Sequence, residues 1–226
     1  MTRFSAPLPA AIVTFPELLR SAGYHTGIQG RNYHLDGSVR QSPEAAAVFE
    51  EFQLRTFHRR VDFLHTGPDD ENLATMQGFL DEVPTGKPFF LWVNYSNPHR
   101  PYTAPAEFLP EPGSLVLPPG YPDTENVRKD LAAYYGEIQQ LDEQVGLILD
   151  ELQDRGLLEN TLVIFMGDNG AALLRGKGTL YETGLRVPFL MRWDRGIKRG
   201  LVSDALLSGE DLAPTVLAIA GVQPDK

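Results

Sequence analysis

The sequence has 226 residues, of which 42% are apolar, 10% aromatic and 22% charged. This composition is typical of a folded globular chain and excludes a disordered or collagen-like protein. Acidic residues outnumber basic ones by 30 to 20, and the formal net charge of −10 argues against nucleic acid as a partner. Cysteine is absent, which excludes disulfides, thiolate metal sites and a cysteine nucleophile within these residues. No apolar run approaches the roughly 18 residues of a membrane span.

The first third of the chain predicts two helices and a strand. Thr14 and Glu17 have the spacing of a capping box at a helix start, and Gly23 is placed to end that helix. A short strand is expected at 24–29. Residues 70–83 repeat apolar side chains on one helical face, which predicts the second helix.

Beyond residue 88 the apolar patterns become stronger. The run 89–93 is apolar throughout, as expected of a strand covered on both faces. The proline-rich segment 108–122 predicts an extended surface loop. The longest helical pattern begins at Asp123 or Thr124 and stops at Gly156. The remaining expected elements are two strands and a helix, at 161–166, 187–193 and 208–220.

This alternation of helices with apolar strands predicts the α/β class, with a mostly parallel or mixed sheet between helices. The length favours one domain, 1–226. In such folds ligands bind outside the carboxyl ends of the strands. Polar residues follow three of the predicted strands, and the candidates for chemistry among them are Arg31, His34, His99, Asp168, Asn169 and Lys177.

Each candidate also has an ordinary structural interpretation. Asp168-Asn169-Gly170 is a common turn sequence, although its oxygens suit Ca²⁺ or Mg²⁺ and two ligands alone are too few. The glycines on both sides of Lys177 provide flexibility, or they let the ammonium group approach an oxyanion closely. His99 is also interpretable as a hydrogen-bonded loop histidine, and Arg31 as a surface ion-pair partner.

The other charged groups receive a structural interpretation. Arg59 and Arg60, with the acidic run 69–71, are interpreted as solvated or helix-capping. His25, His58 and His65 have no partner that the sequence reveals. Taken together, the cations and the Asp-Asn pair at strand ends predict a site for a tetrahedral oxyanion, either sulfate or phosphate.

At these same residues the chain resembles the sulfatases of the alkaline-phosphatase superfamily, and in particular their arylsulfatase-like and heparan N-sulfatase-like members. The resemblance extends over nearly the whole length. The matching segments are 15–27, 88–91 with 97–101, and 160–188. The last of these is the most specific, because Asp168-Asn169-Gly170 and Gly176-Lys177-Gly178 occur in the family's order and spacing.

The resemblance implies a role for each candidate. Asp168 and Asn169 would be two ligands of Ca²⁺, with Mg²⁺ less expected. Lys177 and His99 would hold the sulfate and its bridging oxygen, and one of them would assist the leaving group. His34 would hydrogen-bond the nucleophile, while Arg31 would take the place of a supporting lysine. The partner would be a sulfated small molecule or a sulfated saccharide.

The sequence departs from the family pattern in two respects. Arg31 stands where the commoner family form has a lysine. The motif here also has one more residue before His34 than the commoner form has. The family's nucleophile is a formylglycine made from Cys or Ser in a C/S-x-P-x-R motif, and Ser5-Ala6-Pro7-Leu8-Pro9 lacks the arginine. We therefore expect an N-terminally truncated, alkaline-phosphatase-like piece of a sulfatase catalytic domain, without the nucleophile strand and the C-terminal subdomain. Such a chain is expected to be inactive alone.

Two alternatives remain open on the sequence. One is a phosphatase, phosphodiesterase or phosphonate hydrolase of the same superfamily. Lys177 and the lone Asp168-Asn169 pair favour a sulfatase, because they supply a cation where those enzymes place a second metal. The other is a non-catalytic, anion-binding pseudoenzyme. The sequence leaves the oligomeric state and the cellular compartment open.

Overall fold

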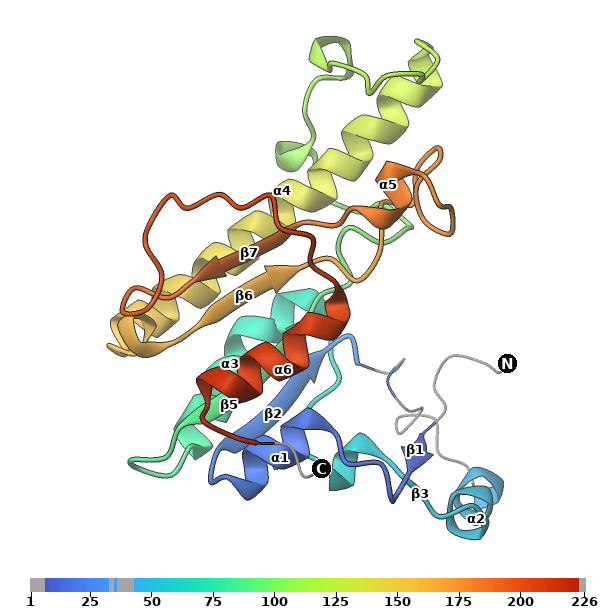
Figure 1. Ribbon diagram of the computed structural model, residues 1–226. Coiled ribbons are helices and arrows are strands. Elements are labelled where there is room, and N and C mark those ends of the chain that lie inside the picture. The colour runs from blue at the N-terminus through green and yellow to red at the C-terminus, as the bar shows by residue number, and fades with distance from the viewer. Residues whose placement is uncertain (1–6, 33–34, 36–42, 224–226) are drawn as a thin grey trace. The chain divides into compact units, whose positions relative to one another are not determined.

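The computed structural model describes residues 7–32, 35 and 43–223 (Figure 1). The chain divides into two compact units. Residues 1–96 with 206–226 form the first unit, and residues 97–205 form the second. No helix in the described part of the chain is both long and apolar enough to cross a membrane.

The first unit contains a parallel three-stranded sheet. Its central strand, β2 (His25–Gly30), lies between β4 (Phe63–Leu64) and β5 (Phe89–Asn94). In the register of β2 with β5, Gly30 lies opposite Asn94. The carboxyl ends of these two strands therefore meet at one edge, as expected of a parallel pair.

Two helices cover opposite faces of this sheet. Phe79 from α3 (Asn72–Glu82) stacks on His25 and contacts Phe89, so α3 lies on the face of the odd-numbered residues. Phe15 from α1 (Phe15–Ser21) packs edge-on against Phe90, which points to the other face because side chains alternate along a strand. The helix α6 (Leu212–Ile219) contacts α1. The short strands β1 (Leu8–Pro9) and β3 (Leu54–Arg55) pair antiparallel, and α2 spans Pro43–Glu51.

The predicted capping box at the first helix is present. The carboxylate of Glu17 accepts hydrogen bonds from the backbone N–H of Thr14 at 2.9 Å and from its hydroxyl at 3.0 Å. Gly23 follows the helix with φ +97°, a conformation that favours glycine. Local capping chemistry thus sets both ends of α1, as the sequence predicted.

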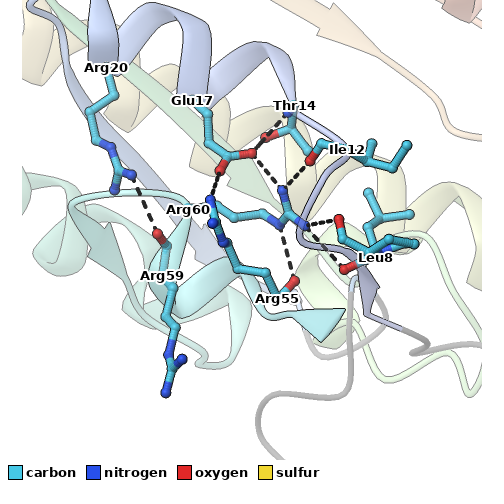
Figure 2. Close-up of polar contacts among 9 residues, drawn as sticks. Leu8, Ile12, Thr14, Glu17, Arg20, Arg55, Arg59 and Arg60 are labelled. Atoms are coloured by element: carbon cyan, nitrogen blue, oxygen red, sulfur yellow. Dashed lines mark hydrogen bonds and ion pairs between the residues drawn. The ribbon is translucent and has the colours of Figure 1, made fainter. Parts of the chain in front are cut away.

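Arg60 is a correction to the sequence analysis, because the side chain is buried and not solvated (Figure 2). Its guanidinium lies 2.6 Å from the Glu17 carboxylate. It also donates to the carbonyl oxygens of Leu8, Pro9, Ile12 and Arg55. A guanidinium can be buried when it is paired and its donors are satisfied, and the charge pattern alone gave no sign of these partners. Arg59 is exposed, as expected.

The second unit contains the long helix α4 (Glu125–Asp154) and an antiparallel strand pair, β6 (Val163–Met166) and β7 (Phe189–Arg192). The side chain of Thr124 caps α4 by accepting from the N–H of Val127. The short helix α5 spans Glu182–Leu185. The proline-rich segment is irregular apart from short 3₁₀ turns, in agreement with the predicted loop.

The α/β class is confirmed: among the described residues the three-stranded sheet is parallel, and the two two-stranded sheets are antiparallel. One expectation does not hold in full. The side chains of β5 and β6 are mostly half-buried, and Trp92 is 37% exposed, whereas the apolar runs predicted strands covered on both faces. Among the described residues β5 pairs with β2 alone and β6 pairs with β7 alone. Each strand therefore has one neighbour in its sheet where a central strand has two.

Candidate active site

Arg31 lies at the edge of the first unit's sheet where β2 and β5 end. Its backbone N–H donates to the carbonyl oxygen of Asn94 at 3.2 Å, and its side chain is half-buried. Gly30 precedes it with φ +80°, and a Cβ there would stand 2.0 Å from the same carbonyl oxygen. Only glycine allows this approach of the two strand ends. The sequence placed Arg31 correctly at a strand end.

A network of buried amides underlies this edge. The side-chain amide of Gln29 donates to the Asn72 carbonyl oxygen at 2.6 Å. Asn72 donates to the carbonyl oxygen of Asn94 at 3.1 Å, and Asn94 donates to that of Gln29 at 3.3 Å. These bonds tie β2, β5 and α3 together beneath Arg31. The sequence did not predict this network, although two amide residues stand near the carboxyl ends of the strands, Gln29 in β2 and Asn94 in β5.

In the described part of the first unit the pKa values of Glu17 and Tyr95 are shifted, and neither residue belongs to the predicted site. Burial, together with the nearby Asp69 carboxylate, raises the pKa of the Tyr95 hydroxyl well above its usual range. Asp69 accepts two bonds from the N–H of Ser96, at 2.7 and 2.9 Å, so the acidic run 69–71 is partly structural. His34 lies outside the described residues, and its predicted role stays a prediction.

Asp168 and Asn169 follow Gly167, the first residue after β6 in the second unit. Both side chains are exposed. The amide nitrogen of Asn169 donates to the Gly170 carbonyl oxygen at 2.9 Å, which leaves the Asn169 Oδ1 oxygen outside that bond. The pair therefore offers hard oxygen atoms to a cation.

Lys177 comes from the same loop, which folds closely on itself. The backbone N–H of Lys177 donates to the carbonyl oxygen of Ala171 at 2.7 Å. A Cβ at Gly176 would stand 2.0 Å from that carbonyl oxygen, and one at Gly170 would stand 2.2 Å from the Thr183 carbonyl oxygen. Close backbone contacts thus require these two glycines. The loop carries three predicted site residues, Lys177 with an exposed side chain among them.

His99 is exposed and lies in a loop near the start of the second unit, which begins at residue 97. Its Nδ1 lies within hydrogen-bond distance of the Arg100 carbonyl oxygen. This contact occupies Nδ1, and Nε2 remains for a ligand. No described contact joins His99 to Asp168, Asn169 or Lys177, and the convergence of the candidates on one cavity stays a prediction.

The described residues offer two of the ligands that the implied metal would need. They contain no group of three or more His, Cys, Asp or Glu side chains that could hold a cation. Asp168 and Asn169 fit two of the six to eight oxygen ligands that Ca²⁺ takes. A cavity of about 400 Å³, which Met191, Trp193 and Leu201 help to line, includes none of the predicted site residues.

The fold is α/β and alkaline-phosphatase-like, with charged and polar side chains at the strand ends. The family model described as "Sulfatase" matches residues 1–222. The chain belongs to the sulfatase family, and the predicted resemblance is confirmed.

Curated relatives show the same membership. The chain is 30% identical over 237 residues to an ulvan-active sulfatase of Formosa agariphila, covering 98% of this chain and 39% of that protein. It is 30% identical over 230 residues to the Homo sapiens N-sulphoglucosamine sulphohydrolase, covering 90% of this chain and 43% of that protein. The chain therefore spans about two fifths of the length of these relatives.

Solved structures agree on the fold. One is a complex of a protein with its substrate D-glucosamine-2-N,6-O-disulfate, with a TM-score of 0.72 and 17% identity, covering 100% of this chain and 64% of that chain. Another is a phosphonate monoester hydrolase from Silicibacter pomeroyi, with a TM-score of 0.69 and 20% identity, covering 98% and 60%. Because this fold occurs in enzymes for different anions, the fold alone leaves the phosphonate hydrolase alternative open.

Proposed function

We propose that this chain is part of an enzyme that hydrolyses sulfate esters or N-sulfates, with a sulfated saccharide as the preferred substrate class. The family membership carries the proposal. The compact loop after β6, which carries Asp168, Asn169 and Lys177, supports it. The proposal of a sulfated saccharide as substrate is based on the similarity to the N-sulphoglucosamine sulphohydrolase.

The chain's own residues would bind the sulfate group and assist its release. The Lys177 ammonium would donate to sulfuryl oxygens, which carry the growing negative charge of the transition state. The Nδ1 atom of His99 contacts the Arg100 carbonyl oxygen, so Nε2 is the ring nitrogen that would contact the leaving oxygen and assist its departure. Arg31 would add positive charge, and His34 would orient the nucleophile.

Asp168 and Asn169 would hold a divalent cation, for which we propose Ca²⁺ over Mg²⁺. Such a cation supplies Lewis-acid stabilisation of the sulfuryl oxygens. The chain contains no cysteine, and its one match to Ser-x-Pro-x-Arg, at 96–100, lies in the segment around His99 that resembles a different part of the family pattern. We therefore propose that the formylglycine nucleophile lies outside these 226 residues, that 1–226 is part of the catalytic domain, and that the isolated chain does not turn over.

Anion binding by the purified chain tests the proposed site. Sulfate is titrated in the presence of CaCl₂ and followed by NMR. Lys177→Ala is expected to weaken sulfate binding by about 10- to 100-fold, the loss of a hydrogen bond to a charged group. Lys87→Ala, which removes the same charge from an exposed lysine of the first unit, is the matched control and is expected to change little. Equal affinities of wild type and Lys177→Ala would contradict the proposed site.

Turnover assays and the coding DNA test whether the isolated chain is inactive and whether the nucleophile lies outside it. The 226-residue chain is expected not to hydrolyse an aryl sulfate. In-frame codons for C/S-x-P-x-R directly upstream of Met1 are expected, and a polypeptide that includes them is expected to release sulfate from N-sulfoglucosamine faster than phosphate from a matched ester. Faster phosphate or phosphonate hydrolysis would favour the other superfamily enzymes. The absence of such codons would favour a non-catalytic, anion-binding pseudoenzyme.

A further inference from the structure

The loop that carries His99 is attached to one face of α4. The side-chain amide of Asn97 donates to the Gln140 side-chain oxygen at 2.9 Å. The guanidinium of Arg100 makes two bonds to the Asp130 carboxylate, at 2.8 and 2.5 Å. These attachments lie on either side of His99 in the sequence. The α4 residues that take part stand about three turns apart along the helix.

Glu137 stands between these attachment points on α4, and its side chain is completely buried. Its Oε1 oxygen accepts from the backbone N–H groups of Thr103 and Ala104, the second at 2.7 Å. Its Oε2 oxygen is buried and has no hydrogen-bond partner in the described structure. The carboxylate therefore directs its hydrogen bonds to the backbone of the loop, four and five residues beyond His99.

This arrangement is costly unless the two N–H bonds are strong. A buried carboxylate loses its hydration, and an unpaired oxygen recovers none of that loss. Hydrogen bonds to an ionised acceptor are about twice as strong as neutral ones. A single oxygen that holds two consecutive N–H groups also fixes the direction of the chain there, which a single bond does not do.

We propose that Glu137 is a positioning residue: it fixes the backbone at Thr103 and Ala104 and thereby holds His99 in place to bind the sulfate group. This inference rests on the proposed function. Asn97 and Arg100 attach the loop to α4 on the two sides of His99. Glu137 fixes the loop backbone further along, at Thr103 and Ala104. His99 itself makes its described side-chain bond to the Arg100 carbonyl oxygen, so its orientation follows the backbone of the loop.

Two variants and a control test this role in the purified 226-residue chain. Glu137→Ala removes both acceptor bonds, whereas Glu137→Gln keeps one carbonyl oxygen that can accept both. Glu143→Gln makes the same chemical change at an exposed position of the same helix. Amide hydrogen exchange at Thr103 and Ala104, the NMR signals of the His99 imidazole and sulfate affinity are measured well below the melting temperature of each variant.

For Glu137→Ala we expect exchange at Thr103 and Ala104 to become about tenfold faster or more, and sulfate affinity to fall about tenfold. Glu137→Gln is expected to restore the affinity to within about threefold of wild type. Glu143→Gln is expected to match wild type in all readouts. A role in stability alone would lower the melting temperature and leave the His99 signals and the sulfate affinity unchanged.

Unchanged exchange at Thr103 and Ala104, or unchanged sulfate affinity in Glu137→Ala, would overturn the inference. Its failure is distinguishable from that of the proposed function. If the wild-type chain binds no sulfate, the proposed function fails. The exchange rates at Thr103 and Ala104 and the His99 signals still decide then whether Glu137 holds the loop.

Discussion

Replacing Arg60 by methionine tests the buried ion pair most sharply, because methionine keeps an apolar side chain of similar length. The substitution removes five hydrogen bonds, one to Glu17 and four to the carbonyl oxygens of Leu8, Pro9, Ile12 and Arg55. The Glu17 carboxylate keeps Arg55 as a partner at 3.0 Å, so it does not become wholly unpaired.

The expected magnitude follows from these contacts. Removing one partner of a buried ion pair costs about 3–5 kcal/mol. Four carbonyl oxygens at about 1–3 kcal/mol each would add more if they stayed buried. Three of them belong to the segment 8–12, and movement of this segment into water in the variant would limit the total. We therefore expect the free energy of unfolding to fall by about 3–5 kcal/mol.

Urea denaturation measures this loss, with Arg59→Met as the control. Arg59 is the adjacent, exposed arginine, and its replacement is expected to change the free energy of unfolding by less than about 0.5 kcal/mol. An exposed ion pair contributes up to about 1 kcal/mol. A fall in the free energy of unfolding of Arg60→Met by less than this would refute a strongly stabilising buried pair.

The remaining predictions concern pH, two glycines and a helix cap. Burial alone would raise the pKa of Glu17, but hydrogen bonds from Thr14, Arg60 and Arg55 lower it below its usual value. Its stabilisation is therefore complete above the unfolded pKa of about 4.3 and is lost as the pH falls through the lower folded pKa. Glu17→Gln should remove this part of the acid dependence in urea titrations from pH 6 to pH 2. Gly176→Ala should destabilise the loop after β6 and weaken sulfate binding, because its Cβ would meet the Ala171 carbonyl oxygen. Gly146→Ala, in α4 with nothing within 4 Å of its Cβ, should stabilise the chain by about 0.5–1 kcal/mol in thermal unfolding. Thr124→Ala should cost about 1 kcal/mol, and a serine at this position should retain most of the cap.

Local chemistry made the secondary structure predictable. The bounds of α1, β5 and α4 follow from the capping pair Thr14–Glu17, an unbroken apolar run and the glycine after each helix. These signals act within a few residues, so they can be found in one sequence. The same reasoning placed Arg31 directly after β2, and Asp168 and Asn169 within three residues of the end of β6.

Contacts between side chains and partners far apart in the sequence could not be predicted. Arg60 and Glu17 stand 43 residues apart, and the Glu137 carboxylate reaches N–H groups 33 and 34 residues away. Nothing in a local pattern specifies such partners. The sequence did contain one signal for Glu137, because this charged residue stands three positions after Tyr134 within the apolar stripe of α4. A charge at a core-facing position was a sign that a specific partner exists.

The central claim is that Lys177, His99 and the pair Asp168 and Asn169 serve one sulfate group. A crystal structure of the chain grown with sulfate and CaCl₂ tests it most directly. We expect a single sulfate about 3 Å from both the Lys177 Nζ and the His99 Nε2 atoms, with a cation on the oxygens of Asp168 and Asn169. A structure in which Lys177 and His99 cannot reach the same sulfate would contradict it.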